Sequence, residues 1–337
     1  MRKIIALLLA LALCLASLSA LADAYPFSSV TMIVPYGAGG TTDVVGRQFA
    51  TALGKALGAT FVVDNRGGAS GAIGCQAVLD ADKDGSVVLF MADSLGTQRV
   101  MDISNLSYAD YDPIMVVAND PKVIVVKGDS KYETIDELLA DIQAAPGSVQ
   151  MSYTGPGGSG HVQALIMNQY GYVPALTPYS SGAECFTAVL GEQVVFTNSN
   201  YSTVVPYLES GDLKILAVAA TERMAAYPDI PCLAEKMENS EALLSIPYTP
   251  LSLLVAKGVP QEVQDQLRAA ALAAIEDPDF DAFMTSNSID KLYEKYTTIE
   301  EIKDFYTEWE STVSWMLYNA GAAEKNPADF GIAEPAL

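Results

Sequence analysis

Histidine is nearly absent from this chain, and cysteine is scarce. The 337 residues contain one histidine, His161, and four cysteines, of which Cys75, Cys185 and Cys232 lie beyond the N-terminal segment. No Cys-x-x-Cys or His-x-x-x-His spacing occurs, so no metal site is expected. These three distant thiols are not a disulfide framework, because at most one bridge can join them. The sequence leaves open whether they are paired or free.

Positive charge is also scarce. The chain has 19 lysine and arginine residues against 41 aspartate and glutamate residues, and its formal net charge is −22. A field of this sign repels nucleic acid and anionic lipid, so neither is expected as a partner. An anionic ligand would therefore need a site that is locally positive within a negative molecule.

Only one long apolar run occurs, and it lies near the N-terminus. Arg2 and Lys3 precede an apolar stretch over residues 4–16, and small residues follow as far as Ala24. This pattern is typical of a secretory signal peptide, because the run is short for a spanning helix and is flanked by positive charge on one side only. We expect residues 1–24 to be a signal peptide, cleaved near Ala24 to leave a periplasmic protein. A membrane anchor is the alternative.

Strand-like and helix-like segments alternate along the rest of the chain. Short β-branched runs predict strands, for example at 30–34 and 87–91, and amphipathic stretches predict helices, for example at 43–57 and 299–320. Such alternation is typical of an α/β fold with mostly parallel sheets and flanking helices. Residues 25–337 are more than one hydrophobic core usually holds, so two domains are expected.

Two proline-containing stretches, 118–122 and 228–250, are candidate crossings between these domains. Two crossings imply that one domain is inserted in the other. We expect a discontinuous first domain of residues 25–120 and 228–337, and an inserted second domain of residues 121–227. Ligands in open α/β sheets bind beyond the carboxyl ends of strands, so both domains can face one cleft.

A glycine-rich loop at residues 36–40 follows the first predicted strand and precedes a helix that opens near Thr41 and Thr42. Glycine lets the backbone approach a ligand closely, and free amides at a helix start favour a negative group. A tight turn with a threonine cap explains the loop equally well. The loop has Thr42 where a dinucleotide fingerprint requires glycine, and the chain has no phosphate loop. No cofactor is therefore expected.

A second glycine-rich loop, at residues 154–161, has the same layout. Ser159 offers a hydroxyl there, and His161 falls in the first helical turn, where we favour a packed residue over a general base. We expect the two loops, one in each domain, to grip opposite ends of a small dianion through main-chain N–H groups and without a cationic side chain. Arg66 and Arg99 are the nearest arginines, and both are expected at the surface.

Two further positions follow predicted strands. Tyr179, in the sequence Pro-Tyr-Ser-Ser-Gly, is expected either to wall a pocket or to pack in a core, and the sequence does not decide between them. Asn198 and Tyr201 follow a strand end and are therefore placed to reach a cleft.

Several of these motifs occur in the same order in one known family. They are IVPYGAGGTTDVVGR, VVDNRGGASGAIG, GGSGH, PYSSG, GEQV and LAVAATERMAAYPDIP. Over essentially all of the chain after the leader, the sequence resembles the periplasmic solute receptors of tripartite tricarboxylate transporters, known as Bug receptors. The resemblance implies a two-lobed type II periplasmic-binding fold whose cleft closes on a small carboxylate. We therefore expect a monomeric protein that is not an enzyme and that delivers its ligand to a membrane permease.

The resemblance, together with the strand-end position of Asn198, implies a ligand-binding site made of Tyr36, Ala38, Gly39, Gly40, Thr41, Thr42, Asp43, Ser159, His161, Tyr179, Ser181, Gly182 and Asn198. Three places depart from the family pattern. Val195 stands where an acidic residue is common, Ser180 where lysine is usual, and Tyr248 and Thr249 where a tryptophan often occurs. These departures concern the second domain's share of the site.

Other functions fit the sequence less well. An exported hydrolase would need a nucleophile with a base, and no Gly-x-Ser-x-Gly elbow accompanies the single histidine. A redox enzyme would need the dinucleotide fingerprint that is missing. A receptor that only senses its ligand would use the same site as a transport receptor, and the sequence does not separate the two.

Overall fold

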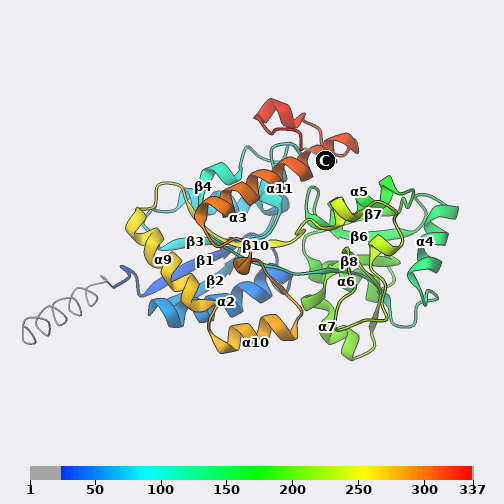
Figure 1. Cartoon of the computed structure of the whole chain (residues 1–337), viewed down its shortest axis with the longest axis horizontal. Helices are drawn as coiled ribbons and strands as arrows, with labels where there is room; N and C mark the ends of the chain where they lie inside the picture. The colour runs from blue at the N-terminus through cyan, green and yellow to red at the C-terminus, as the bar shows by residue number, and fades with distance from the viewer. Residues whose placement is uncertain (1–23, 336–337) are drawn as a thin grey trace, which may run out of the picture.

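A computed structural model describes residues 24–335. The predicted signal peptide, apart from Ala24, lies outside the described residues. The chain forms two α/β lobes that lie side by side (Figure 1). The expected two-lobed α/β organisation is therefore confirmed. Within the described part of the chain, no helix is both long enough and apolar enough to cross a bilayer.

The first lobe is built on a six-stranded sheet with the order β11-β4-β10-β3-β1-β2. Its strands are β1 (Ser29–Val34), β2 (Thr60–Asn65), β3 (Val87–Met91), β4 (Tyr111–Asn119), β10 (Pro250–Ala256) and β11 (Asp290–Lys291). Its helices are α2 (Thr41–Leu57), α3 (Ala72–Asp80), α9 (Gln261–Ala274), α10 (Pro278–Ser286) and α11 (Ile299–Asn319).

The second lobe has a five-stranded sheet with the order β7-β6-β8-β5-β9. Its strands are β5 (Lys122–Lys127), β6 (Gln150–Thr154), β7 (Ala175–Tyr179), β8 (Phe196–Asn200) and β9 (Leu213–Val218). The helices are α4 (Ile135–Ala144), α5 (Ser159–Gln169), α6 (Gly182–Leu190) and α7 (Tyr201–Glu209), and the short α8 (Glu241–Leu244) lies in the segment that leads back to the first lobe.

Both sheets are mixed, whereas strand–helix alternation predicts mostly parallel pairing. In the first lobe β1 is parallel to β2 and β3, but β10 is antiparallel to both β3 and β4. In the second lobe β6 is parallel to β7 and β8, but β5 is antiparallel to β8 and β9. Strand β11 is also antiparallel to its neighbour β4. The reversed strands β5 and β10 each enter a sheet directly after the chain crosses from the other lobe.

Alternating side chains of the first sheet are buried on its two faces. Met32 packs in a cluster with residues of α2, α9 and α10, such as Phe49 and Phe280. Its neighbour Ile33 packs in a second cluster with α3 and α11, which continues into the second lobe beneath α4 and α5. This is the two-residue period of a strand that is covered by helices on both sides.

Local signals explain where several helices begin. A capping box begins α4: the Glu137 amide donates to Thr134 Oγ1 at 3.3 Å, and the Thr134 amide donates to Glu137 Oε2 at 3.2 Å. Helix α11 lies in the stretch predicted as an amphipathic helix, and its apolar side chains are buried, namely Ile302, Phe305, Trp309, Val313 and Met316.

Strand β7 and helix α7 lie where local sequence patterns predict no such element. Strand β7 contains Pro178, and the β-branched run Thr203-Val204-Val205 followed by Pro206 inside α7 is unfavourable for a helix. Tertiary packing overrides these propensities, since Val204 is fully buried in the second-lobe core.

The chain passes from β4 to β5 through Asp120 and Pro121. Residues after the expected return at 228 still contact the second lobe. Cys232 packs in the second-lobe core, and Lys236 Nζ lies 2.7 Å from Asp136 at the start of α4. These contacts favour a return crossing just before β10 over the expected one at residue 228, and the domain limits stay a proposal.

Helix α3 packs tightly against the end of β1, which positions the first glycine loop. A Cβ at Gly74 would lie 2.6 Å from the Arg66 carbonyl oxygen and 2.7 Å from Pro35 Cα. We predict that Gly74→Ala lowers the free energy of unfolding by at least about 2 kcal/mol, because backbone atoms have little freedom to move away. Urea denaturation measures this loss. Gly191→Ala is the control, since its Cβ meets only ordinary contacts at 3.4 Å or more; equal losses in the two variants would contradict the prediction.

Candidate functional site

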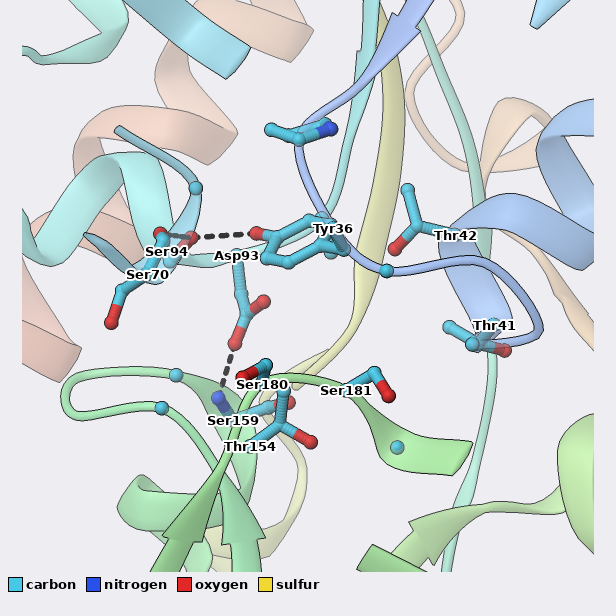
Figure 2. A pocket seen from close by; sticks show the side chains of 18 of the residues that line it. Tyr36, Thr41, Thr42, Ser70, Asp93, Ser94, Thr154, Ser159, Ser180 and Ser181 are labelled. Atoms are coloured by element: carbon cyan, nitrogen blue, oxygen red, sulfur yellow. Dashed lines mark hydrogen bonds between the residues drawn. The ribbon is translucent and has the colours of Figure 1, made fainter. Parts of the chain in front are cut away.

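A cavity of about 450 Å³ lies between the lobes at the carboxyl ends of several strands (Figure 2). The first lobe contributes the residues after β1 and β3 and the loop at 68–71. The second lobe contributes the residues after β6 and β7 and the end of β8. This is the position where open α/β sheets bind ligands.

Five helices begin at this cavity. The residues that precede α2, α3, α5, α6 and α7 all line it, namely Gly40, Gly71, Gly158, Ser181 and Asn200. Each helix start carries unpaired main-chain N–H groups and the positive end of the helix dipole. The cavity is therefore locally favourable for negative charge, although the whole chain carries −22.

Two of these helix starts are already bound to carboxylates of the protein itself. The Ser159 amide, in the first turn of α5, donates to Asp93 Oδ2. The Ser202 amide, in the first turn of α7, donates to Asp120 Oδ1 at 3.3 Å. The expected grip of the second glycine loop on a ligand carboxylate therefore has a resident competitor, Asp93, which the sequence analysis does not anticipate.

The starts of α6 and α2 differ. Ser181 Oγ caps α6 by accepting from the Glu184 amide at 3.2 Å. Helix α2 begins after Gly40, and no side chain of the described residues caps it. The expected cap by Thr41 or Thr42 is wrong, because both residues lie within the first helical turn. Helix α3 has no side-chain cap either, but its Ala72 and Ile73 amides donate to the carbonyls of Ala69 and Gly68. Of the five helix starts, α2 is the one at which neither a side chain nor a loop carbonyl of the described residues accepts from the first three amides.

The cavity also contains a cation, contrary to expectation. Lys122 is only 5% exposed, lines the cavity, and donates from Nζ to Asn200 Oδ1 at 2.9 Å. Burial lowers the pKa of Lys122, and the charges of Asp93 and Asp120 oppose that shift. Its sequence position could have identified Lys122 as a lining residue, because it directly follows the crossing at Pro121. In the sheet it pairs with Asn200 at the end of β8.

The two arginines nearest the loops are not in the cavity lining. Arg66 pairs with Asp64 at 2.8 Å near the surface, and Arg99 pairs with Glu310 at 2.8 Å.

A chain of hydrogen bonds fixes Tyr36 against the loop at 68–71 (Figure 2). Ser94 Oγ donates to the Ser70 carbonyl at 2.7 Å, so the Tyr36 hydroxyl, 2.6 Å from Ser94 Oγ, is the donor to it. Burial raises the pKa of Tyr36, and the charge of Asp93 adds to that effect. Tyr36 is therefore a neutral wall of the cavity.

The lobes touch each other on both sides of the cavity. Ser70 Oγ donates to the Pro156 carbonyl at 3.0 Å, and Thr97 Oγ1 donates to the Gly157 carbonyl at 3.0 Å. On the other side, Thr41 Oγ1 lies 2.9 Å from Ser202 Oγ. These contacts, with the bond from Ser159 to Asp93, hold the lobes together over the cavity.

Eight of the predicted site residues line the cavity: Tyr36, Gly40, Thr41, Thr42, Ser159, Tyr179, Ser181 and Gly182. Tyr179 is thus placed at the pocket wall. The other five, Ala38, Gly39, Asp43, His161 and Asn198, are not part of the lining. A ligand-binding role for any of the thirteen stays a prediction.

The residues outside the lining shape the two loops. Asp43 Oδ2 accepts from the Gly39 amide at 2.9 Å and thereby closes the first loop. His161 Nδ1 accepts from the Gly157 amide at 3.2 Å, and its ring stacks on Tyr153 with centroids 5.1 Å apart. Asn198 Nδ2 donates to the Gly160 carbonyl at 2.9 Å.

Several lining residues escape the sequence analysis, among them Ser70, Asp93, Ser94, Lys122, Asn200 and Thr249. Asp93 and Ser94 follow the buried strand β3 almost directly. The strand-end argument that selects Asn198 would have selected them too.

The cysteines outside the predicted leader are free and buried. This settles the question that the sequence left open. Within residues 24–335, no cluster of histidine, cysteine and acidic side chains has the arrangement of a metal site.

Comparisons with known proteins identify the family. The model described as the tripartite tricarboxylate transporter family receptor matches residues 45–311. The chain belongs to this family. Protein BugT of Bordetella pertussis is 32% identical over 219 residues, which cover 64% of this chain and 67% of BugT. The expected relation to Bug receptors is confirmed.

Solved structures agree with this assignment. The periplasmic binding protein BugD superimposes with a TM-score of 0.81 at 27% identity, covering 89% of this chain and 100% of BugD. MatC from Rhodopseudomonas palustris, solved with bound malate, has a TM-score of 0.78 at 22% identity and covers 87% of this chain and 100% of MatC. The second likeness shows the fold alone. The chain is therefore a periplasmic solute-binding protein of the Bug type with the expected fold.

Asp120 allows a test of the electrostatics beside the cavity. Burial raises its pKa to about 6, although Ser202, Thr41 and Lys122 favour the ionised form. An unfolded aspartate titrates near pH 4. Between about pH 4 and pH 6 the folded state therefore binds more protons than the unfolded state, so this carboxyl makes the free energy of unfolding fall as pH rises, by up to about 3 kcal/mol.

We predict that Asp120→Asn removes this fall. The stability of the variant relative to the unmodified protein should then increase from pH 4 to pH 6.5 and stay level above it, as measured by urea denaturation at several pH values. Asp129→Asn is the control, because that carboxylate is 77% exposed. A relative stability of Asp120→Asn that does not change with pH would contradict the prediction.

Proposed function

We propose that this receptor captures a small organic acid between its lobes and delivers it to the permease of a tripartite tricarboxylate transporter. The observation that carries the proposal is the start of α2, which opens on the cavity without a side-chain acceptor. A ligand carboxylate would supply the acceptor that this helix start lacks.

The donors available at this position suit one carboxylate. The amides of Thr41 and Thr42 lie in the first turn of α2, and Lys122 adds a buried positive charge that lines the same cavity. Hydrogen bonds to a charged group contribute roughly 1.5–3 kcal/mol each before the costs of association. Three or four such bonds are consistent with micromolar affinity and with release to a partner.

The size of the cavity supports a small ligand. About 450 Å³ lies in the lower part of the range of small-molecule sites. Tyr36 and Tyr179 supply flat walls, and the contacts between Ser70 and Pro156 and between Thr97 and Gly157 join the two lobes beside the cavity. A ligand held there would bridge the lobes and stabilise their closed arrangement by hinge closure.

The geometry gives little support to the hydrolase alternative. His161 Nδ1 already accepts from the Gly157 amide, and its ring stacks on Tyr153. The Ser159 amide is bound to Asp93, so it is not free to form an oxyanion hole. The family is one of solute receptors.

Delivery to a permease and a sensing role remain to be separated by experiment. We propose a monomeric receptor, to be checked by sedimentation, that restores uptake of its ligand when added to vesicles holding the permease subunits. Binding without any uptake would favour the sensor.

Binding at the start of α2 has a direct test. A Cβ at Gly40 would meet only the Gly37 carbonyl at 3.6 Å and the Gly182 amide at 3.9 Å, so the fold accommodates a side chain there. We predict that a thermal-shift screen of small carboxylic and amino acids finds at least one that raises the melting temperature, and that Gly40→Val abolishes that shift by covering the helix amides.

The matched control is Gly191→Val, which lies outside the cavity and should keep the shift. The proposal fails if no organic acid shifts the unmodified protein, or if Gly40→Val binds the acid as tightly as before.

A further inference from the structure

The lining of the cavity contains one acid and one base. Asp93 is 4% exposed and Lys122 is 5% exposed, and the other residues that line the cavity are uncharged. Asp93 comes from the first lobe, two residues after β3, and reaches across to the Ser159 amide of the second lobe. A buried carboxylate in a site for organic acids requires an explanation, because it repels a negative ligand.

A ligand with two carboxylates fits this lining poorly. One carboxylate can bind at α2, but the second glycine loop, which would hold the other, has its Ser159 amide bound to Asp93. The second carboxylate would then lie beside Asp93. The two ligand carboxylates, Asp93 and Lys122 would together carry a charge of about −2. Two like charges held close together in a cavity that is partly shielded from solvent repel each other.

A ligand with one carboxylate and one ammonium group balances the lining. Asp93 and the first turn of α2 lie on opposite sides of the view in Figure 2, with Tyr36 between them. The hydroxyls of Ser94 and Ser180 also line the cavity and are further acceptors for an ammonium group, which has three protons to donate.

We propose that Asp93 is a specificity-determining residue that accepts the protonated amino group of the ligand, and that the receptor therefore selects amino acids over the corresponding hydroxy or unsubstituted acids. This inference rests on the proposed function, since it takes the carboxylate of the same ligand to bind at α2. It identifies the chemical class of the ligand, an amino acid small enough for a cavity of about 450 Å³.

The state of Asp93 offers one competing explanation. Burial raises the pKa of Asp93, whereas Lys122 and the Ser159 amide lower it. A protonated Asp93 would donate a hydrogen bond to a second ligand carboxylate, and the receptor would then prefer dicarboxylates. The two explanations predict opposite orders of affinity.

The experiment is calorimetric titration of the full-length mature protein with two matched series. One series is L-aspartate, L-malate and succinate, and the other is L-alanine, L-lactate and propionate. In at least one series the amino acid should bind at least tenfold tighter than both of its partners. Asp93→Asn should weaken binding of that amino acid by at least tenfold and leave the hydroxy acid within about threefold.

Asp129→Asn, a change at an exposed carboxylate, should leave every affinity unchanged. The order of affinities in the unmodified protein tests the inference even if Asp93→Asn does not fold. Equal or tighter binding of malate, lactate, succinate or propionate would overturn this inference alone. If none of the six acids binds, the inference about Asp93 and the choice of these acids as ligands are both wrong. If the thermal-shift screen finds another acid that binds, the proposed receptor function still holds.

Discussion

The site depends on the convergence of five helix N-termini on one cavity. Four of these helices directly follow a strand that ends there, so the α/β arrangement itself creates a positive field inside a chain of net charge −22. Two of the starts are neutralised by Asp93 and Asp120, and that of α6 by its own Ser181. The first amides of α3 donate to loop carbonyls, so the start of α2 is the one that remains free, and Lys122 adds a positive charge to the same lining. The fold therefore creates a cavity that can bind an anion. The acidic side chains of the protein limit that binding to one end of the cavity.

The resident carboxylates also connect the lobes. Asp93 leaves the first lobe to accept from Ser159 in the second. Asp120 lies at the crossing itself and accepts from Thr41 of the first lobe and from Ser202 of the second. A buried carboxylate without such donors would be costly, so these bonds favour the arrangement in which the lobes are in contact. The same donors that hold the lobes together thus surround the proposed ligand site.

Local patterns predicted the first loop well and the charges of the site poorly. A strand that ends in three glycines before a helix places Gly40 and Thr41 at the cavity, as expected, because that geometry depends on neighbouring residues. Lys122 and Asp93 lie far apart in sequence and come together only through the pairing of β5 with β8 and the closure of the lobes. The strand end before Asp93 and the crossing before Lys122 mark each position separately, but no local pattern shows that the two charges share one lining. The order of the family motifs predicted the fold, but it did not show that an acid lies in that lining.

The position of Thr41 shows why binding and closure belong to one process. Its amide lies in the uncapped first turn of α2, while its hydroxyl donates to Asp120 and lies 2.9 Å from Ser202 Oγ of the second lobe. The proposed ligand carboxylate therefore accepts from the amide of Thr41, while the carboxylate of Asp120 accepts from its hydroxyl. Opening the lobes would break the hydroxyl contacts, and a ligand that orders the first turn of α2 also orders the side chain that spans the gap. Any acid whose carboxylate reaches α2 then favours closure of the lobes. Asp93, at the opposite end of the cavity, selects among such acids.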